Sequence, residues 1–203
     1  MELILVRHAL PERKELSTGA ADPDLTDAGH RQAELLAEYL GDEPITFVYT
    51  SPLRRAVQTA APLARRLGLA AVVVDDIAEF DRHASSYIPI EELKASGDPR
   101  FHDLSSDIWA GDDPDERVGA AIDRLIDTHP GETIVVVCHG GVINTVLATV
   151  LGIDHAGPGF FYPNYTSIHR VAASRSGIRS IVTINETSHL RNTGLPMGLF
   201  QKG

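Results

Sequence analysis

The sequence has few of the features that would place it outside the soluble globular proteins. It contains one cysteine, Cys138, so no disulfide bond can form within the chain. No apolar run approaches the roughly 20 residues that a membrane-spanning helix needs. The residues after Met1 do not form a secretory signal peptide, because only four apolar residues precede the first arginine. We therefore expect a cytoplasmic protein without a membrane partner.

Basic residues are also scarce. The 203-residue chain has 18 Lys and Arg against 28 Asp and Glu, which gives a formal net charge of −10. Nucleic-acid backbones attract basic surfaces, so this balance argues against a nucleic-acid partner. It is compatible with a small anionic substrate, because a few arginines in a pocket can reverse the local potential.

Several catalytic motifs are absent as well. There is no H-E-x-x-H pair and no G-x-x-x-x-G-K-[ST] loop, which argues against a zinc protease and a P-loop nucleotide site. A cysteine phosphatase needs an arginine six residues after its cysteine, and Asn144 stands at that distance from Cys138. We expect neither a metal nor a cofactor.

Short apolar runs alternate with helical patterns, which predicts an α/β fold with a mainly parallel sheet. Thr26 and Ser51 are expected to cap helices, with Pro52 in the first helical position and Pro62 as a kink. The expected strands are 3–6, 45–50, 70–75, 133–138, 166–173 and 178–184. The expected helices are 27–40, 52–67, 90–96, 115–128 and 141–151.

Polar residues follow three of the predicted strands directly. The first strand ends in Arg7-His8, and the most apolar strand ends in His139-Gly140. A third strand leads through Ser51 to Arg55. Because ligands of parallel sheets bind at the carboxyl ends of strands, we expect these residues to meet. The helix that begins near Gly140 would also direct backbone N–H groups at an anion.

This set of residue types suits the transfer of a phosphoryl group. An imidazole can attack phosphorus and hold the group covalently. Arginines bind its oxygens bidentately and remain charged at any working pH. An acidic side chain must then protonate the leaving alkoxide. None of these steps requires a metal.

The motifs around these residues resemble those of the histidine phosphatase superfamily. LVRHALPE is similar to the family's first-strand motif, which usually reads Arg-His-Gly. TSPLRRAVQTA and LTDAGHRQA resemble two of its helix motifs, and VVCHGGVI resembles its second histidine motif. Together they span residues 3 to about 152.

The resemblance implies a fold and an organisation. The family fold is a three-layer α/β/α sandwich with a mainly parallel central sheet, like that of cofactor-dependent phosphoglycerate mutase. Residues 1–203 would form one domain, in which 78–112 are an insertion that covers the substrate.

The resemblance also implies a role for each matching residue. His8 is the nucleophile, Arg7 and Arg55 bind the phosphoryl group, and His139 stabilises its charge beside Gly140. Glu79 matches the acid that protonates the leaving group and later activates water. The sequence after it departs from the family pattern, however, so Asp81 is a rival for that role.

The implied activity is hydrolysis of a small phosphomonoester through a phosphohistidine. Ala9 replaces the usual glycine after the nucleophile, and the loop 10–24 lacks the Asn and Arg pattern that mutases use on their substrate. The stretch between Glu79 and His139 is also short for a mutase. A phosphomutase and a non-catalytic phospho-ligand-binding module remain as alternatives. The sequence decides neither the physiological substrate nor the oligomeric state.

Overall fold

The structure is a computed structural model that describes residues 1–100, 114–153 and 161–198. Its main sheet has six strands in the order β4-β3-β6-β1-β7-β8. The first four run parallel to one another, whereas β7 is antiparallel to both of its neighbours. The strands are β1 (Glu2–Arg7), β3 (Phe47–Thr50), β4 (Ala71–Val73), β6 (Thr133–Cys138), β7 (Ile168–Ala173) and β8 (Arg179–Glu186).

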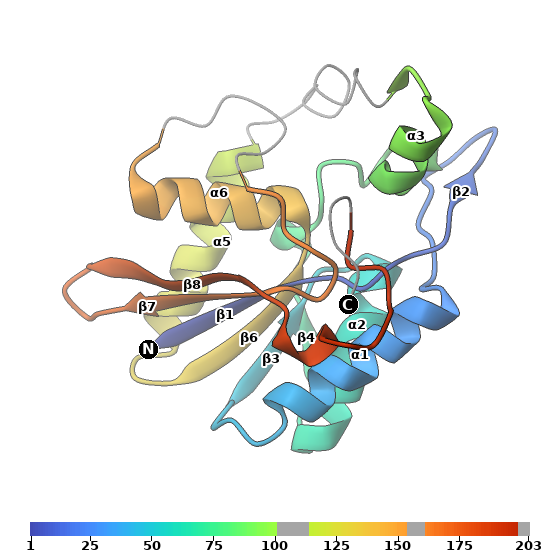
Figure 1. Cartoon of the computed structure of the whole chain (residues 1–203). Coiled ribbons are helices and arrows are strands. Elements are labelled where there is room, and N and C mark those ends of the chain that lie inside the picture. The colour runs from blue at the N-terminus through green and yellow to red at the C-terminus, as the bar shows by residue number, and fades with distance from the viewer. Residues whose placement is uncertain (101–113, 154–160, 199–203) are drawn as a thin grey trace.

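Helices cover both faces of this sheet, which gives the expected three-layer α/β/α sandwich (Figure 1). One face packs against α5 and α6, and the other against α1 and α2. A short helix, α3, lies beyond the end of the sheet. The helices are α1 (Asp27–Leu40), α2 (Arg54–Leu67), α3 (Ile90–Ser96), α5 (Pro114–Thr128) and α6 (Gly140–Leu151).

The apolar strands explain why helices cover the sheet on both faces. In β1, Leu3 and Leu5 point to the α5 and α6 layer, while Ile4 and Val6 point to the α1 and α2 layer. All four side chains are fully buried. A strand buried on both faces reads as a continuous apolar run, and β6 shows the same pattern.

The helix boundaries follow the sequence in α1 but not in α2. The Thr26 hydroxyl accepts a 2.9 Å hydrogen bond from the Gly29 N–H, which confirms Thr26 as the cap of α1. The prediction that Ser51 caps α2 and that Pro52 begins it is wrong. The helix begins at Arg54, and its N-cap residue Leu53 makes no side-chain cap bond.

A second, two-stranded sheet was not predicted. It pairs β2 (Lys14–Glu15) with β5 (Ser86–Tyr87) in antiparallel fashion. This pairing ties the loop after β1 to the segment before α3, and Figure 1 shows β2 and α3 beside each other. Strands of two residues carry no periodicity, so the sequence offered no signal for them.

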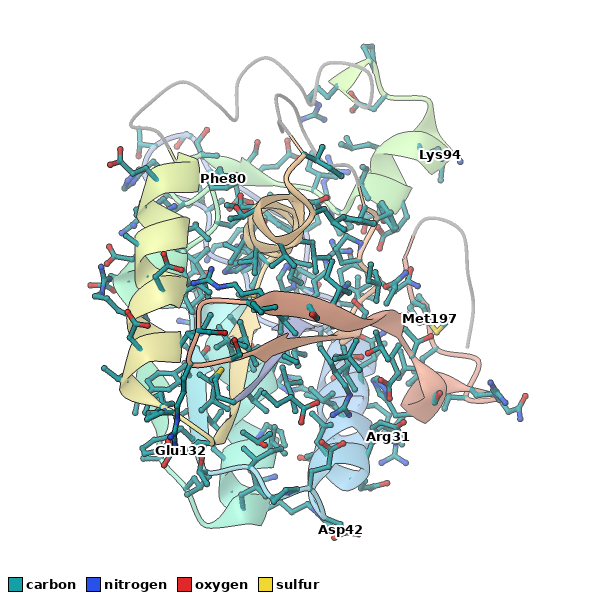
Figure 2. All side chains as sticks on the ribbon, turned by 90° about the vertical axis from the view of Figure 1, so that its left-hand side faces the viewer. Arg31, Asp42, Phe80, Lys94, Glu132 and Met197 are labelled. Atoms are coloured by element: carbon teal, nitrogen blue, oxygen red, sulfur yellow. The ribbon has the colours of Figure 1, made fainter. Side chains whose placement is uncertain are left out.

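Two landmarks orient the molecule along the strands. In Figure 2, Phe80 and Lys94 lie at one end, whereas Asp42 and Glu132 lie at the opposite end. The Phe80 ring reaches Gly141, which follows β6, so the first end is the carboxyl end of the parallel strands. Within the described residues no helix is long and apolar enough to cross a membrane.

Gly29 allows α1 to approach the loop after β1, and this contact can be tested. A Cβ at Gly29 would collide with the Leu10 carbonyl oxygen, whereas a Cβ at Gly119 in α5 would meet no atom within 4 Å. We expect Gly29→Ala to lower the free energy of unfolding in urea by about 1–3 kcal/mol through overpacking. The matched change Gly119→Ala should raise it by about 0.5–1 kcal/mol, because alanine favours a helix. Equal effects of the two changes would contradict the close approach.

Candidate active site

The register between β1 and β6 brings the two motif histidines together. Arg7 pairs with Cys138 across the parallel ladder, and the His8 N–H donates a 2.9 Å hydrogen bond to the Cys138 carbonyl. His8 and His139 therefore leave adjacent strands at the same height. The centroids of their rings lie 5.1 Å apart, which is close enough for both imidazoles to contact one tetrahedral anion.

His8 is held in the form that a nucleophile requires. Its side chain is only 3% exposed, and its Nδ1 lies 2.8 Å from the Ala9 carbonyl oxygen. A carbonyl can only accept, so Nδ1 carries the hydrogen and the lone pair of Nε2 is available. Burial, together with Arg55 and Arg7, holds the pKa of His8 well below its usual range. The imidazole is thus neutral at physiological pH.

His139 is positioned by Ser51, which the sequence predicted to be a helix cap. Its Nε2 lies 2.7 Å from the hydroxyl oxygen of Ser51, which is itself fully buried. Burial, Arg55 and His8 keep the pKa of His139 well below the ordinary value. Its buried Nδ1 has no hydrogen-bond partner within the part of the chain that the structure describes. Ser51 therefore contacts His139, and its hydroxyl also accepts a 3.3 Å hydrogen bond from the Leu53 N–H.

Arg55 enters the site from the first turn of α2. Its side chain is 1% exposed, and its Nη2 donates a 2.8 Å hydrogen bond to the Asp81 carboxylate. The guanidinium carbon lies 4.6 Å from the centre of the Tyr87 ring. This packing fixes the plane of the guanidinium, so its remaining donors are directed before any ligand arrives.

Arg7 is fixed in a similar way on the other side of His8. Its Nη1 donates a 2.6 Å hydrogen bond to the Pro163 carbonyl, and its guanidinium carbon stacks 4.3 Å from the Tyr165 ring centre. The Nε atoms of Arg7 and Arg55 are buried without a partner among the described residues. A buried donor without an acceptor destabilises the folded state, and a bound oxyanion would accept hydrogen bonds from both of these atoms.

Glu79 lies against the start of α6. Its carboxylate accepts hydrogen bonds from the backbone N–H groups of Gly141, at 3.0 Å, and Phe80, at 3.1 Å. Burial and the nearby Asp81 raise the pKa of Glu79 above its ordinary value, against these hydrogen bonds. Of the N–H groups that this helix end directs at the site, the one from Gly141 is therefore taken by Glu79.

The glycine pair after His139 is explained by this contact. A Cβ on Gly141 would collide with the Glu79 carboxylate and the Phe80 ring, whereas one on Gly140 would meet nothing within 4 Å. Gly141 therefore admits the carboxylate. Contact between Gly140 and a phosphate remains a prediction.

The structure separates the two candidate acids by their partners. Asp81 is paired with Arg55, while the Glu79 carboxylate accepts hydrogen bonds from two backbone N–H groups, and burial and Asp81 raise its pKa. A carboxyl group that retains its proton more readily suits a general acid better. Tyr87 also lies at this site, with its ring centre 6.5 Å from that of His8.

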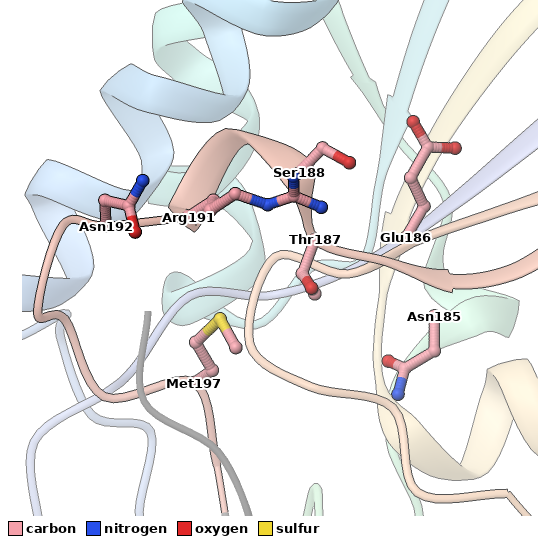
Figure 3. A pocket seen from close by; sticks show the side chains of 7 residues that line it. All are labelled: Asn185, Glu186, Thr187, Ser188, Arg191, Asn192 and Met197. Atoms are coloured by element: carbon pink, nitrogen blue, oxygen red, sulfur yellow. The ribbon is translucent and has the colours of Figure 1, made fainter.

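A separate cavity of about 500 Å³ lies elsewhere, near the end of β8 (Figure 3). It is lined mostly by polar residues, among them Glu186 and Arg191, and includes neither of the motif histidines. Among the residues that the structure covers, no cluster of three or more His, Cys, Asp or Glu could hold a metal ion. The chemistry-bearing residues of the motifs thus gather at one place, at the carboxyl ends of β1, β3 and β6.

Curated relatives match much of this chain. This chain is 33% identical over 202 residues to a bifunctional protein of Mycobacterium tuberculosis. The match covers 93% of this chain and 54% of that protein. The chain thus spans about half the length of this relative. It is also 30% identical over 164 residues to phosphoserine phosphatase 1 of Hydrogenobacter thermophilus, covering 76% of this chain and 78% of that one.

Solved structures of phosphatases share the fold. A mutant phosphoserine phosphatase from Entamoeba histolytica, in complex with phosphoserine, matches with a TM-score of 0.71 at 24% identity, over 93% of this chain and 98% of that one. A mycobacterial glucosyl-3-phosphoglycerate phosphatase matches with a TM-score of 0.67 at 22% identity, over 92% and 99%.

A family model provides the decisive comparison. The model of the histidine phosphatase superfamily (branch 1) matches residues 3–187, which is most of the chain and includes every residue placed at the site above. The chain belongs to the histidine phosphatase superfamily.

Proposed function

We propose that the chain is a metal-independent phosphomonoester hydrolase that forms a phosphohistidine on His8. The observation that carries the proposal is a buried His8 with a lowered pKa, whose Nδ1 faces the Ala9 carbonyl and whose ring lies beside His139 and two oriented arginines. Nucleophile and charge stabilisers are in place before substrate binds, so little reorganisation is needed during the reaction.

In the first step, Nε2 of His8 attacks phosphorus and the bond from phosphorus to the ester oxygen breaks. Arg7, Arg55 and His139 stabilise the charge on the three non-bridging oxygens. Glu79 gives its proton to the departing alkoxide, which leaves as an alcohol. In the second step the Glu79 carboxylate takes a proton from water, whose oxygen attacks phosphorus and releases phosphate and His8.

The substrate is proposed to be a small phosphorylated metabolite in the cytoplasm. Relatives named for phosphoserine hydrolysis support a small phosphomonoester. We further infer a single domain whose residues 78–112 cover the substrate. The described part of that segment supports this inference, since Tyr87 lies 4.6 Å from the Arg55 guanidinium and 6.5 Å from the His8 ring.

Replacing the nucleophile tests the covalent step. In a rapid-quench experiment with labelled substrate, the wild type should carry acid-labile, base-stable phosphate, and His8→Ala should carry none. Its kcat should fall by about a thousandfold or more, because the attacking nitrogen is removed. The control His30→Ala alters an exposed histidine on α1 and should keep both phosphoenzyme and turnover. Full activity in His8→Ala would exclude the proposed mechanism.

Replacing the acid tests the assignment of Glu79. With Glu79→Gln, kcat/KM for an alkyl phosphate, which reports the first step, should fall by about 10²- to 10⁴-fold. The kcat/KM for p-nitrophenyl phosphate should fall far less, because nitrophenolate leaves without a proton. Asp81→Asn should slow both substrates alike, through its effect on Arg55. If Asp81→Asn shows the leaving-group dependence and Glu79→Gln does not, Asp81 is the acid.

The raised pKa of Glu79 predicts a pH dependence. The proton on Glu79 is needed in the first step, so kcat for an alkyl phosphate should fall as the pH rises through that pKa. A profile between about pH 5 and pH 9 should show this alkaline decline in the wild type. Glu79→Gln should not show this decline, because a glutamine side chain has no proton to lose in that pH range. An unchanged decline in the variant would assign it to another group.

A further inference from the structure

A third carboxylate lies close to the proposed phosphate site and takes no part in the mechanism above. Glu91 stands in the first turn of α3, and its Oε2 accepts a 3.2 Å hydrogen bond from the Tyr165 hydroxyl. The Tyr165 ring packs 4.3 Å from the Arg7 guanidinium carbon and 6.0 Å from the His8 ring. Glu91 is thus one side chain away from both of these residues.

The second oxygen of this carboxylate is not satisfied. Glu91 Oε1 is buried and has no hydrogen-bond partner within the described part of the chain. A buried carboxylate oxygen without a donor is costly, so its presence beside a binding site indicates a donor that arrives with the ligand. Tyr165 occupies Oε2, which leaves Oε1 for that donor.

The charges around the site indicate what kind of donor fits. Arg7 and Arg55 supply two positive charges, and the carboxylates of Asp81 and Glu91 already balance them in number. Burial opposes the charge on Arg7, but Tyr165, Tyr87 and Glu91 raise its pKa. A bound phosphate dianion would leave the site with excess negative charge, unless the organic part of the substrate is cationic.

We infer that Glu91 is a specificity-determining residue, which selects phosphomonoesters whose organic part carries a protonated amine. The ammonium group would donate to Glu91 Oε1 while the phosphate lies against Arg7 and Arg55. Substrates with a carboxylate at that position would be repelled by Glu91. This inference rests on the proposed phosphatase function and adds to it the chemistry of the substrate.

Two substrates of equal shape test the inference. O-phosphoethanolamine and n-propyl phosphate differ only by an ammonium group in place of a methyl group. We expect the wild type to prefer the amine by about 10- to 100-fold in kcat/KM, the range of a hydrogen bond to a charged group. Glu91→Gln should reduce this preference at least about fivefold. Glu92→Gln, an exposed neighbour on α3, should leave it unchanged.

A substrate with a carboxylate gives a second test, in which the variant should gain activity. A variant that failed to fold would only lose activity. Removing the charge should raise kcat/KM for 2-phosphoglycolate in Glu91→Gln by about fivefold over the wild type, because the repulsion is gone. A preference for the amine near one in the wild type would overturn the inference. The inference would also be overturned if Glu91→Gln kept the preference for the amine, or if Glu92→Gln lost that preference to the same extent as Glu91→Gln.

Binding separates this inference from the proposed function. Calorimetric titration of His8→Ala with the same two phosphate esters measures the preference without turnover. The amine should again bind about 10- to 100-fold more tightly. If the wild type forms no phosphoenzyme but the preference holds, only the hydrolytic function fails. If hydrolysis is normal and both esters bind equally, only the role of Glu91 fails.

Discussion

The pairing of β1 with β6 is the constraint on which the site depends. In this parallel ladder Arg7 lies opposite Cys138, so each strand delivers its histidine one residue later at the same edge. Both strands are buried on both faces, which fixes their register strongly. A shift by one residue would exchange the side chains of the two faces and disrupt their packing against both helix layers. The distance between the imidazoles is therefore a consequence of the core.

Burying the charged groups of the site beyond this edge destabilises the folded state, and contacts within the site offset part of that cost. Two buried guanidinium groups rest on the rings of Tyr165 and Tyr87, and one is paired with Asp81. The imidazoles stay neutral because burial and the arginines disfavour a further positive charge. The two arginines that lower the pKa of His8 are also the groups proposed to bind the phosphate. In the proposed mechanism, binding and activation of the nucleophile therefore depend on the same two side chains.

Much of this could be predicted from the sequence, because the motifs follow directly on strands. The apolar runs predicted the six strands of the main sheet, and the Arg-His and His-Gly-Gly segments predicted which strand ends would meet. The sequence failed where side chains have two possible partners. Ser51 stands where a helix cap is expected, but its hydroxyl contacts His139 as well as the Leu53 N–H, and α2 begins only at Arg54.

Other residues at the site carry no sequence signal, because their positions depend on tertiary contacts. Tyr165 belongs to a fully buried turn before β7, and only its packing shows that it supports Arg7. Glu91 lies on a short helix next to a second glutamate, Glu92, and its buried oxygen is visible only in three dimensions. Whether Glu79 or Asp81 acts as the acid was open in the sequence for the same reason. The ion pair of Asp81 now favours Glu79.

The central claim is that two imidazoles and two guanidinium groups surround one tetrahedral phosphorus. A crystal structure of the protein with orthovanadate, a mimic of the phosphoryl group in transfer, tests this claim most directly. The account predicts vanadium bonded to Nε2 of His8, with its oxygens contacting Arg7, Arg55 and His139. Vanadate bonded elsewhere, or bound at this edge without a bond to His8, would contradict it.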